Sequence, residues 1–340
     1  MTSTTLQRIR AFVSLLTGAY ALGLLIFLVL RLMTNDGLWW VALLANFTPF
    51  YFAAFAVLLP LALLFRAKRG ALLMLPLVVV GAIWFGRLYL PKAQAQAGDA
   101  PTLRVVSFNV WGDNPNIVEV EDWLREMRAD VAIIIEMPSV WADGLPALTE
   151  TYPEQLILSD TSGLYWDSAV LSRYPLVSAE QIDLGDGEIP QSRIVVEVDG
   201  RQIAVYGIHL YVPVSRTRQM YQTAGFYNDS ARDSQIRTLL HRLEDEPLPY
   251  VVAGDFNMSD QTVIYNELAA LMGDSFREAG RGLGTSWPNF QRFGLTGLIP
   301  PLVRIDYIWH SNDFRAIEAA QGPYLGSDHL PLYATLALES

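Results

Sequence analysis

The stretch Tyr250-Val251-Val252-Ala253-Gly254-Asp255-Phe256-Asn257 decides the interpretation of the C-terminal part of the chain. Its first residues form an apolar run of the kind found in buried strands, and a glycine, a carboxylate and an amide follow at once. A hydrophobic core does not select polar side chains at such a position, because buried polar groups need partners. The stretch therefore indicates a strand that delivers Asp255 and Asn257 to a functional edge of a sheet.

The same arrangement recurs along residues 103–338, where strand-like and helix-like segments alternate. Asp199-Gly200 predicts a two-residue hairpin turn between strands at 194–198 and 202–210. Carboxylate, amide and imidazole side chains repeatedly lie at or beside strand ends. They are Asn109, Glu136, His209, Asp255, Asn257, Asp306, Asp328 and His329. Strand ends on one rim of a sheet lie close together, so we expect these side chains to meet in one pocket.

This set of side chains favours a particular metal chemistry. Several carboxylates in one pocket repel one another unless a cation lies among them. The sequence has no cysteine and only four histidines, which excludes disulfides and thiolate zinc sites and disfavours a multi-histidine cage. Carboxylate and amide oxygens suit Mg²⁺ or Mn²⁺ instead. Histidines beside such a metal bind phosphate or transfer protons, so the set predicts metal-assisted phosphoester hydrolysis.

Each residue also has an ordinary structural interpretation. Taken alone, Asn109 or Asp255 is typical of a turn or a helix cap. Asp306 is harder to explain in this way, because a carboxylate within an apolar strand at 303–309 needs a partner, and a histidine is a natural one.

Three further polar residues lie outside the set. His241, on a predicted helix, and His310, after a strand, are expected to be solvated. Arg173 is a candidate substrate-binding residue that could hold a phosphate, and an ordinary surface ion pair is the alternative. The chain has no Gly-x-Ser-x-Gly motif, which disfavours a serine hydrolase.

The first hundred residues differ from the rest in charge. They contain eight basic and two acidic residues, a net charge of +6, and this leaves 16 basic and 33 acidic residues, a net charge of −17, for residues 101–340. Apolar runs at 11–32, 38–65 and 70–90 have about the length that a helix needs to cross a bilayer. The third run includes Arg87, and a re-entrant or interfacial helix is its alternative.

Basic residues in the loops predict an orientation. Arg8 and Arg10 precede the first run, and Arg66, Lys68 and Arg69 lie between the second and third runs. By the positive-inside rule both segments are cytoplasmic, so three crossings place the remainder on the extracytoplasmic side. We expect a multi-pass protein of the plasma or inner membrane. If the third run does not cross, the orientation inverts.

The expected domains are a transmembrane anchor at 1–91, a linker at 92–101 and a catalytic domain at 102–340. The Ala-Gln-Ala pattern within the linker is also compatible with a processing site.

In chain order, the polar motifs resemble those of a known group of proteins. They are Ser107-Phe108-Asn109-Val110-Trp111, the strand ending at Glu136, Gly207-Ile208-His209-Leu210, Gly254-Asp255-Phe256-Asn257, Arg304-Ile305-Asp306-Tyr307-Ile308 and Ser327-Asp328-His329. This order resembles the endonuclease/exonuclease/phosphatase superfamily, which includes DNase I, inositol polyphosphate 5-phosphatases and neutral sphingomyelinases. The resemblance spans about residues 102–338. One departure is Ile135, where the family usually has glutamine, and we expect it to change the surroundings of Glu136 more than the metal site.

The resemblance implies a four-layered α/β sandwich, in which two packed sheets are flanked by helices and the site lies at one rim. It implies that Glu136 is the principal Mg²⁺ ligand and that Asn109 and Asp328 complete its surroundings, with Mn²⁺ as an alternative metal.

The resemblance also implies roles for the other residues. Asp255 would orient or deprotonate the attacking water, and Asn257 would hold that water or a phosphate oxygen. His329, oriented by Asp306, would stabilise charge on the phosphoryl oxygens. His209 would bind phosphate and could protonate the leaving group.

We therefore expect a membrane-anchored, metal-dependent phosphoesterase that acts on a small phosphoester or a lipid head group. The bilayer and this substrate are its expected partners, and no obligate protein partner is implied. The net charge of −17 on residues 101–340 lacks the basic footprint needed to grip a long nucleic acid. An extracytoplasmic DNase or RNase and a catalytically inactive, membrane-tethered binding module are the alternatives.

Overall fold

The computed structural model describes residues 3–92, 98, 100–141, 143–159, 166–185, 189, 191–214, 225–294 and 299–339. The chain divides into two compact units. The first, here called the helical unit, is built mainly on Met1–Leu90, and the second, the sheet unit, contains most of Pro91–Ser340. Most of the predicted linker, at 93–97 and 99, lies outside the described residues.

The helical unit contains two continuous apolar helices. Its elements are α1 (Ser3–Thr34), α2 (Trp39–Ala45), α3 (Thr48–Ala53), α4 (Phe55–Leu64), α5 (Lys68–Trp84) and the 3-10 helix η1 (Gly86–Tyr89). The segments Thr4–Thr34 and Lys68–Tyr89 are long and apolar enough to cross a membrane, with mean hydropathies of 2.3 and 2.0. The third predicted run contains Arg87, which left its crossing of the membrane open. It forms α5 followed by η1, and together these meet the length and hydropathy needed to cross.

The second predicted run, at 38–65, does not form one straight helix, and this part of the prediction is wrong. Helix α2 and the segment Thr48–Leu64 meet at a bend of 62°. Pro49 has no N–H to continue the hydrogen bonding of α2. Asn46 Nδ2 instead donates to the carbonyl of Ala42 at 2.9 Å, at the end of that helix. The run is thus a broken span or a re-entrant segment.

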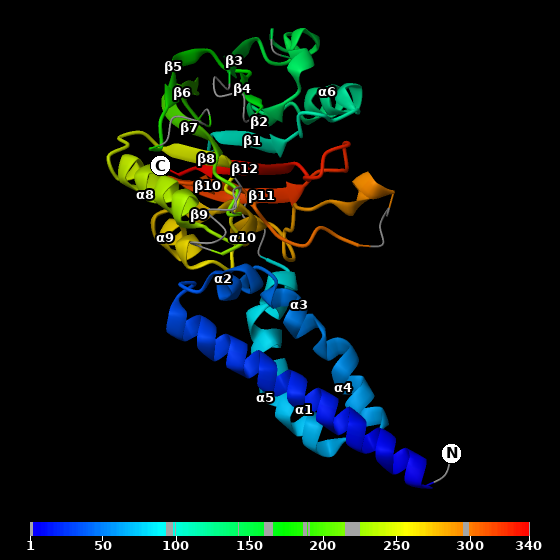
Figure 1. Cartoon of the computed structure of the whole chain (residues 1–340). Helices are drawn as coiled ribbons and strands as arrows, with labels where there is room; N and C mark the ends of the chain where they lie inside the picture. Colours follow the sequence, from blue (N-terminus) through cyan, green and yellow to red (C-terminus); the bar gives the residue numbers. More distant parts are fainter. Residues whose placement is uncertain are drawn as a thin grey trace. The chain divides into compact units, whose positions relative to one another are not determined.

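Two six-stranded mixed sheets form the sheet unit (Figure 1). In the first, the strand order is β11-β12-β1-β2-β4-β3, and in the second it is β5-β6-β7-β8-β10-β9. The strands of the first sheet are β1 (Thr102–Asn109), β2 (Val131–Met137), β3 (Glu154–Leu158), β4 (Asp167–Ser172), β11 (Phe314–Gln321) and β12 (Leu332–Leu338). Those of the second are β5 (Leu176–Ile182), β6 (Gln191–Val198), β7 (Arg201–His209), β8 (Tyr250–Asp255), β9 (Gly273–Asp274) and β10 (Asp306–His310). Strands β1 and β2 pair in parallel, as do β7 and β8.

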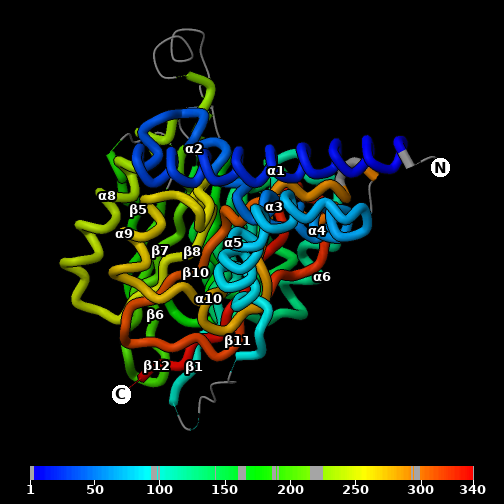
Figure 2. The backbone as a smooth tube through the Cα atoms, turned by 90° about the horizontal axis from the view of Figure 1, so that it is seen from below, coloured from blue at the N-terminus to red at the C-terminus, as the bar shows by residue number. Residues whose placement is uncertain are grey.

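Helices cover the outer faces of both sheets. The helical elements are α6 (Ile117–Met127), η2 (Ser139–Trp141), η3 (Pro146–Leu148), α8 (Ser230–Glu244), α9 (Val263–Leu271), α10 (Ser275–Ala279) and η4 (Phe290–Phe293). One apolar cluster joins the facing sides of the two sheets, and two others join the first sheet to α6 and the second to α8 and α9. Helices α6 and α8 accordingly lie on opposite outer sides (Figure 2). The sheet unit is therefore the four-layered α/β sandwich that the sequence implied.

The predicted hairpin fixes the register of two central strands. Asp199 and Gly200 have φ angles of 50° and 78°, as a type I′ turn requires at both central positions. Val198 pairs with Arg201 beside this turn, and the ladder runs to the pair Ser192 and Gly207. The hairpin thereby places the start of β6 beside the end of β7.

A buried ion pair lies under the second sheet. Arg304 and Asp274 are both buried, and the guanidinium of Arg304 hydrogen-bonds to the carboxylate of Asp274. The same carboxylate caps α10 by accepting from the N–H of Phe276 at 3.1 Å. Burial opposes ionisation of Asp274, but Arg304 outweighs it and holds the pKa of Asp274 below its usual range.

We expect Asp274→Asn to lower the free energy of unfolding by about 3–5 kcal/mol, because the buried guanidinium loses its counter-charge. Denaturant unfolding of the detergent-solubilised protein measures this loss. The matched control is Glu267→Gln, which breaks an exposed pair with Arg237 and is expected to cost less than about 1 kcal/mol. Equal losses in the two variants would contradict the prediction.

The prediction that His310 is solvated is wrong. Only 2% of the residue is exposed. Its Nε2 lies 3.1 Å from Glu278 Oε2, and its Nδ1 lies 2.9 Å from the carbonyl oxygen of Ser311. Acceptors at both ring nitrogens favour the imidazolium form. Burial lowers the pKa of His310, but Glu278 outweighs it, so that the pKa is raised.

This pair makes stability depend on pH on both sides of neutrality. The raised pKa of His310 means that its contribution is full below the unfolded value of about 6.5 and is lost as pH rises through the folded pKa. The pKa of Glu278 is lowered because His310 outweighs the effect of burial, so its contribution is lost as pH falls. We expect His310→Gln to reduce the fall in unfolding free energy between pH 6 and 9. His241→Gln, at an exposed site, should show the same fall as the wild type. An unchanged alkaline fall in His310→Gln would refute this.

Candidate active site

Five strands of the two sheets bring polar side chains to one rim of the sheet unit. The pair Asn109 and Ile135 ends the β1–β2 ladder, and Glu136 follows Ile135. In the second sheet, His209 lies beside Asp255, which in turn pairs with Asp306. These residues meet because the parallel strands of each sheet end on the same side.

Asn109 joins the two sheets at this rim. Its Nδ2 donates to Asp255 Oδ2 at 3.1 Å, and its Oδ1 accepts from the N–H of Trp111 at 3.2 Å. Its carbonyl oxygen accepts from the Ser327 hydroxyl at 2.7 Å. Ser327 Oγ in turn accepts from the N–H of His329 at 2.9 Å. The Ser-Asp-His segment is therefore tied to the end of β1.

His329 lies between two carboxylates. Its Nδ1 is 2.9 Å from Asp306 Oδ2, and its Nε2 is 3.8 Å from Asp255 Oδ2. The expected histidine partner of Asp306 is thus present. Burial lowers the pKa of His329, but Asp306 outweighs it and the net shift is upward. Burial, together with Asp306, raises the pKa of Asp255.

Glu136 lies in a backbone conformation that few residues adopt. The pairing of β2 with β4 slips between Ile134 and Met137, and Glu136 has a φ of 52°. Its Oε1 lies 3.6 Å from His209 Nε2, which is longer than a hydrogen bond. Burial raises the pKa of this carboxyl. Strained backbone of this kind concentrates at functional sites.

The Gly-Asp-Phe-Asn segment requires its glycine. Gly254 has a φ of 153°, and a Cβ there would lie 1.8 Å from the carbonyl oxygen of Ile208. The close approach lets Asn257 turn back, with its N–H donating to Asp255 Oδ1 at 2.9 Å and its Nδ2 donating to the Leu210 carbonyl at 2.8 Å. Asn257 itself has a φ of 48°.

Helix α8 supplies two buried polar residues that the motifs did not reveal. Arg232 donates to the carbonyl of Asn257 at 2.9 Å, and Gln235 Oε1 accepts from the N–H of Tyr211 at 2.9 Å. They occupy the same helix face as the buried Ile236 and Leu239. In the sequence, the polar residues on an otherwise apolar face of this helix could have indicated that Arg232 and Gln235 are buried beside the site.

Trp287 is a second residue that the motifs did not reveal. Its Nε1 donates to Asp328 Oδ2 at 3.2 Å, and its ring centroid lies 6.4 Å from that of His329. It is 37% exposed beside the rim. Nothing in its local sequence marked it, because Asp328 lies 41 residues away.

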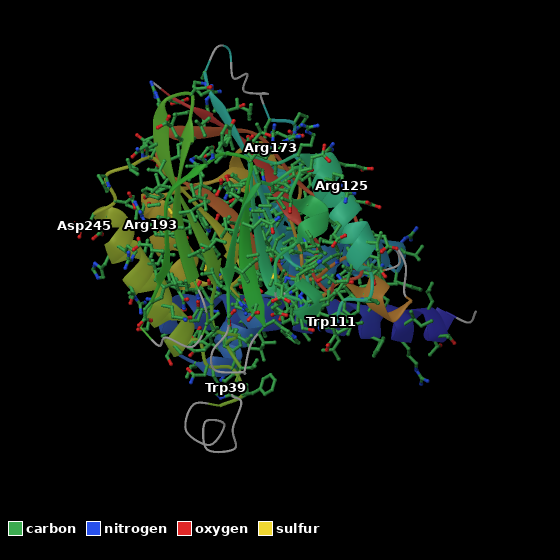
Figure 3. The ribbon with its side chains drawn as sticks, turned by 90° about the horizontal axis from the view of Figure 1, so that it is seen from above. Trp39, Trp111, Arg125, Arg173, Arg193 and Asp245 are labelled. Atoms are coloured by element: carbon green, nitrogen blue, oxygen red, sulfur yellow. The ribbon has the colours of Figure 1, made fainter. Side chains whose placement is uncertain are left out.

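Arg173 does not lie at this rim. It follows β4, whose Ser172 pairs with Val131 at the start of β2, at the other end of that strand from Glu136. Its guanidinium pairs with Asp130 Oδ1 at 3.1 Å. Figure 3 shows Arg173 and Trp111 well apart. The structure thus corrects the expectation that Arg173 binds substrate, and gives it the alternative role of an ion pair.

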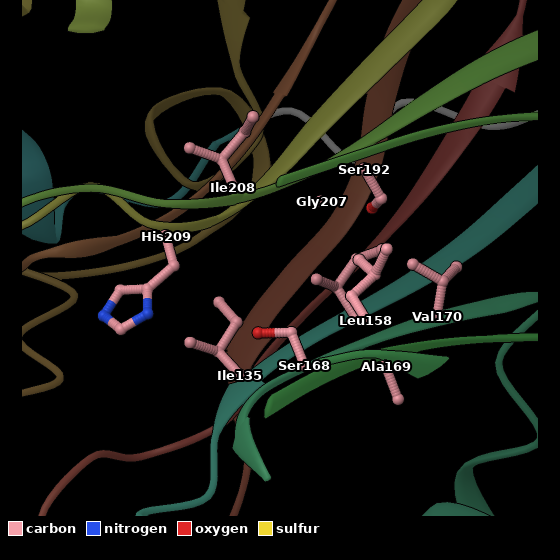
Figure 4. A pocket seen from close by; sticks show the side chains of 10 residues that line it. Ile135, Leu158, Ser168, Ala169, Val170, Ser192, Gly207, Ile208 and His209 are labelled. Atoms are coloured by element: carbon pink, nitrogen blue, oxygen red, sulfur yellow. The ribbon is translucent and has the colours of Figure 1, made fainter. Parts of the chain in front are cut away.

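The departure at Ile135 gives His209 an apolar neighbour. Ile135 is buried between the sheets and, with Leu158, Ser168 and His209, lines a cavity of about 10 Å³ (Figure 4). This is about the volume that one water molecule requires.

The acidic and histidine side chains at the rim fit a hard cation. One ligand atom from each of Asp255, Asp306 and His329 lies within 4.8 Å of the others. Among the described residues, Asp306 Oδ1 is buried with no hydrogen-bond partner, which is costly for a carboxylate unless a cation satisfies it. Glu136 is electrostatically coupled to His329 and to Asp328, so it borders the same group. The bond to His329 uses only Oδ2 of Asp306, so Oδ1 is the atom of this carboxylate that is open to a cation.

Comparisons with known proteins agree with this geometry. A model of the endonuclease/exonuclease/phosphatase family matches residues 106–329. No curated protein matches the chain.

Several solved structures share the fold of the sheet unit. The endonuclease/exonuclease/phosphatase from Bacteroides vulgatus is 17% identical, with a TM-score of 0.56, over 70% of this chain and 99% of that one. A mannosyl-6-phosphatase from Bacteroides thetaiotaomicron is 15% identical, with a TM-score of 0.53, over 69% of this chain and 100% of that one. A truncated TDP2 from Caenorhabditis elegans is 16% identical, with a TM-score of 0.52, over 69% of this chain and 98% of that one. At these identities the likeness shows the fold alone.

Proposed function

The chain belongs to the endonuclease/exonuclease/phosphatase family, and we propose that it is a membrane-anchored, divalent-metal-dependent phosphoesterase. Members of the family are hydrolases that act on phosphoester bonds. The observation that carries the proposal is the buried cluster of Asp255, Asp306 and His329 beside Glu136 and His209. No other site chemistry follows as directly from four acidic and histidine-bearing strand ends that meet at one rim.

Glu136 would hold Mg²⁺ or Mn²⁺, with Asn109 and Asp328 beside it. When bound, the metal supplies Lewis-acid stabilisation of the charge that develops on the phosphoryl oxygens. The raised pKa of Glu136 supports this assignment, because a buried carboxylate gains most from a nearby cation.

Asp255 would accept a proton from the attacking water. Its raised pKa makes it a stronger base than an exposed carboxylate, and bonds from Asn109 and Asn257 fix its orientation. Asn257 would hold the water or a phosphate oxygen in line with the leaving group.

The two histidines would act on the phosphate. His329, held by Asp306, keeps its positive charge towards the site and would stabilise the phosphoryl oxygens. His209, at the end of β7, would bind phosphate and protonate the leaving group.

The proposed substrate is a small phosphoester or a lipid head group at the bilayer. Two helices apolar enough to span support the anchor, and a third span follows if the bent α2–α4 segment crosses. With three spans, the basic loops orient the sheet unit to the extracytoplasmic side of the plasma or inner membrane. A fusion after Ser340 of periplasmic phosphatase or a cytoplasmic fluorescent protein tests this side. Fluorescence without phosphatase activity would refute it.

Substrate class is tested with the full chain in phospholipid vesicles containing Mg²⁺ or Mn²⁺. The panel comprises p-nitrophenyl phosphate, bis-p-nitrophenyl phosphate, the vesicle lipids themselves and double-stranded DNA. We expect turnover of a small ester or of the lipid head groups, and little of DNA, because the −17 charge of residues 101–340 repels a polyanion. Preferential DNA hydrolysis would support the nuclease alternative. Metal binding without turnover of any substrate would indicate the inactive binding module.

A further inference from the structure

The backbone of His209 is held by a side chain at the edge of its strand. Gln191 lies at the start of β6. Its Oε1 accepts from the N–H of His209 at 2.7 Å, and its Nε2 donates to the carbonyl oxygen of His209. Only 1% of Gln191 and 3% of His209 are exposed. One amide side chain therefore satisfies both backbone groups of His209 in a buried setting.

The strand register explains why a side chain is needed there. The β6–β7 ladder begins beside the two-residue turn with Val198 and Arg201 and continues to Ser192 and Gly207. Among the described residues this ladder ends two residues before His209, so the N–H and the carbonyl of His209 need partners from elsewhere. Gln191 supplies both the missing donor and an acceptor.

The next residue of β7 is held from the opposite side. The N–H of Leu210 donates to the carbonyl of Asp255 at 2.9 Å, and its carbonyl accepts from Asn257 Nδ2 at 2.8 Å. The peptide unit between His209 and Leu210 is thus bound on one side by the Gln191 side chain and on the other by the main chain of Asp255, and the Asn257 amide binds the next peptide unit. This rigidity fixes the direction in which the imidazole leaves the strand, with its Nε2 3.6 Å from Glu136 Oε1.

We propose that Gln191 is a positioning residue for His209, an inference that rests on the proposed phosphoesterase function. Gln191 holds the end of β7 so that the imidazole meets the phosphate with the correct geometry. If the end of β7 were less rigid, the protein would still bind substrate through the metal site and His329. The rate of the catalytic step would fall instead. Small misplacements of this kind cost far more in rate than in binding.

The chain offers a matched control for this clamp. Gln155 makes the same pair of bonds with another backbone position, accepting from the N–H of Leu145 at 2.9 Å and donating to its carbonyl at 3.0 Å. It lies on β3, which is an edge strand of the first sheet. Gln155 pairs with Leu171 near the end of β4 that leads to Arg173, away from the rim.

The experiment compares Gln191→Met with Gln155→Met in the full chain, with bis-p-nitrophenyl phosphate and Mg²⁺. Both variants keep the side-chain length and lose the bonds to one backbone position, and Gln155→Met also loses a bond of 3.3 Å from Nε2 to the Tyr152 carbonyl. We therefore expect both variants to lower the melting temperature. For Gln191→Met we expect kcat to fall about 10- to 100-fold with KM within about threefold. For Gln155→Met we expect kcat within about twofold of the wild type. Gln191→Glu keeps the acceptor for the His209 N–H and should recover part of the rate.

Equal kcat values in the two methionine variants would overturn the clamp while leaving the hydrolase intact. Absence of turnover in the wild type would overturn the proposed function instead, and the clamp is then judged by a second readout. Histidine-selective ¹⁵N labelling gives few signals in a chain with four histidines. The ring signals of His209 should shift or broaden in Gln191→Met and not in Gln155→Met. Unchanged signals in both variants would refute the proposal.

Discussion

His329→Gln is expected to lower kcat for phosphoester hydrolysis by about a thousandfold, with a much smaller change in KM. The imidazole lies between Asp306 and Asp255, and its raised pKa keeps it charged at neutral pH. Glutamine retains a hydrogen-bond donor but carries no charge, so the charge developing on the phosphoryl oxygens loses its counterpart. Steady-state kinetics on bis-p-nitrophenyl phosphate measure the effect.

Two companion variants sharpen this prediction. Asp306→Asn leaves the ring in place but removes the carboxylate that raises its pKa, so its kcat should lie between those of wild type and His329→Gln. His241→Gln changes a histidine whose side chain is 82% exposed and should leave kcat unchanged. A full rate in His329→Gln would remove this residue from the catalytic account.

Glu136→Gln is expected to weaken divalent-metal binding by at least about a hundredfold, since losing even an outer partner of a metal ligand costs 10- to 100-fold. The substitution removes one charge from a buried carboxyl at nearly constant shape. Titration with Mn²⁺ followed by electron paramagnetic resonance measures the affinity directly. Mg²⁺ should also raise the melting temperature of the wild type and not that of the variant, because a ligand of the folded state stabilises it.

The control for this variant is Glu119→Gln, an exposed acid of α6. It should bind Mn²⁺ as the wild type does. Identical Mn²⁺ affinities for wild type and Glu136→Gln would contradict the role of Glu136 as a metal ligand. The metal site would then be assigned to Asp255, Asp306 and His329.

Local sequence predicted the parts of the site that depend on strand ends. Asn109, His209 and Asp255 each end a strand, Glu136 lies one residue before the end of β2, and the parallel pairs of each sheet bring these ends to one rim. The hairpin at Asp199-Gly200 was equally predictable, because only a few residues tolerate positive φ at both positions.

The features that the sequence could not predict depend on residues that are far apart in the chain. His310 looked solvated because Glu278 lies 32 residues earlier in the chain. Arg173 follows a strand like the other site residues, but β4 runs antiparallel to β2 and carries it to the opposite end. The need for the Gln191 side chain appears only once it is known where the described β6–β7 ladder ends.

The helical unit shows the same limit. Length and hydropathy predicted three spans, and the two continuous helices α1 and α5 meet these criteria. The bend of 62° lies where the Asn46 side chain donates to the end of α2 and where Pro49 has no N–H, and an average hydropathy over the run does not register either feature.

The central claim is that the rim at Glu136 and His329 hydrolyses phosphoesters with a divalent metal. The most direct test is the rate of bis-p-nitrophenyl phosphate hydrolysis by the purified full chain with Mg²⁺, with Mn²⁺ and with EDTA, beside Glu136→Gln in each condition. The account predicts turnover with either metal, none with EDTA, and at most a trace in the variant even at high metal concentration. Turnover that survives EDTA, or that Glu136→Gln leaves intact, would contradict it.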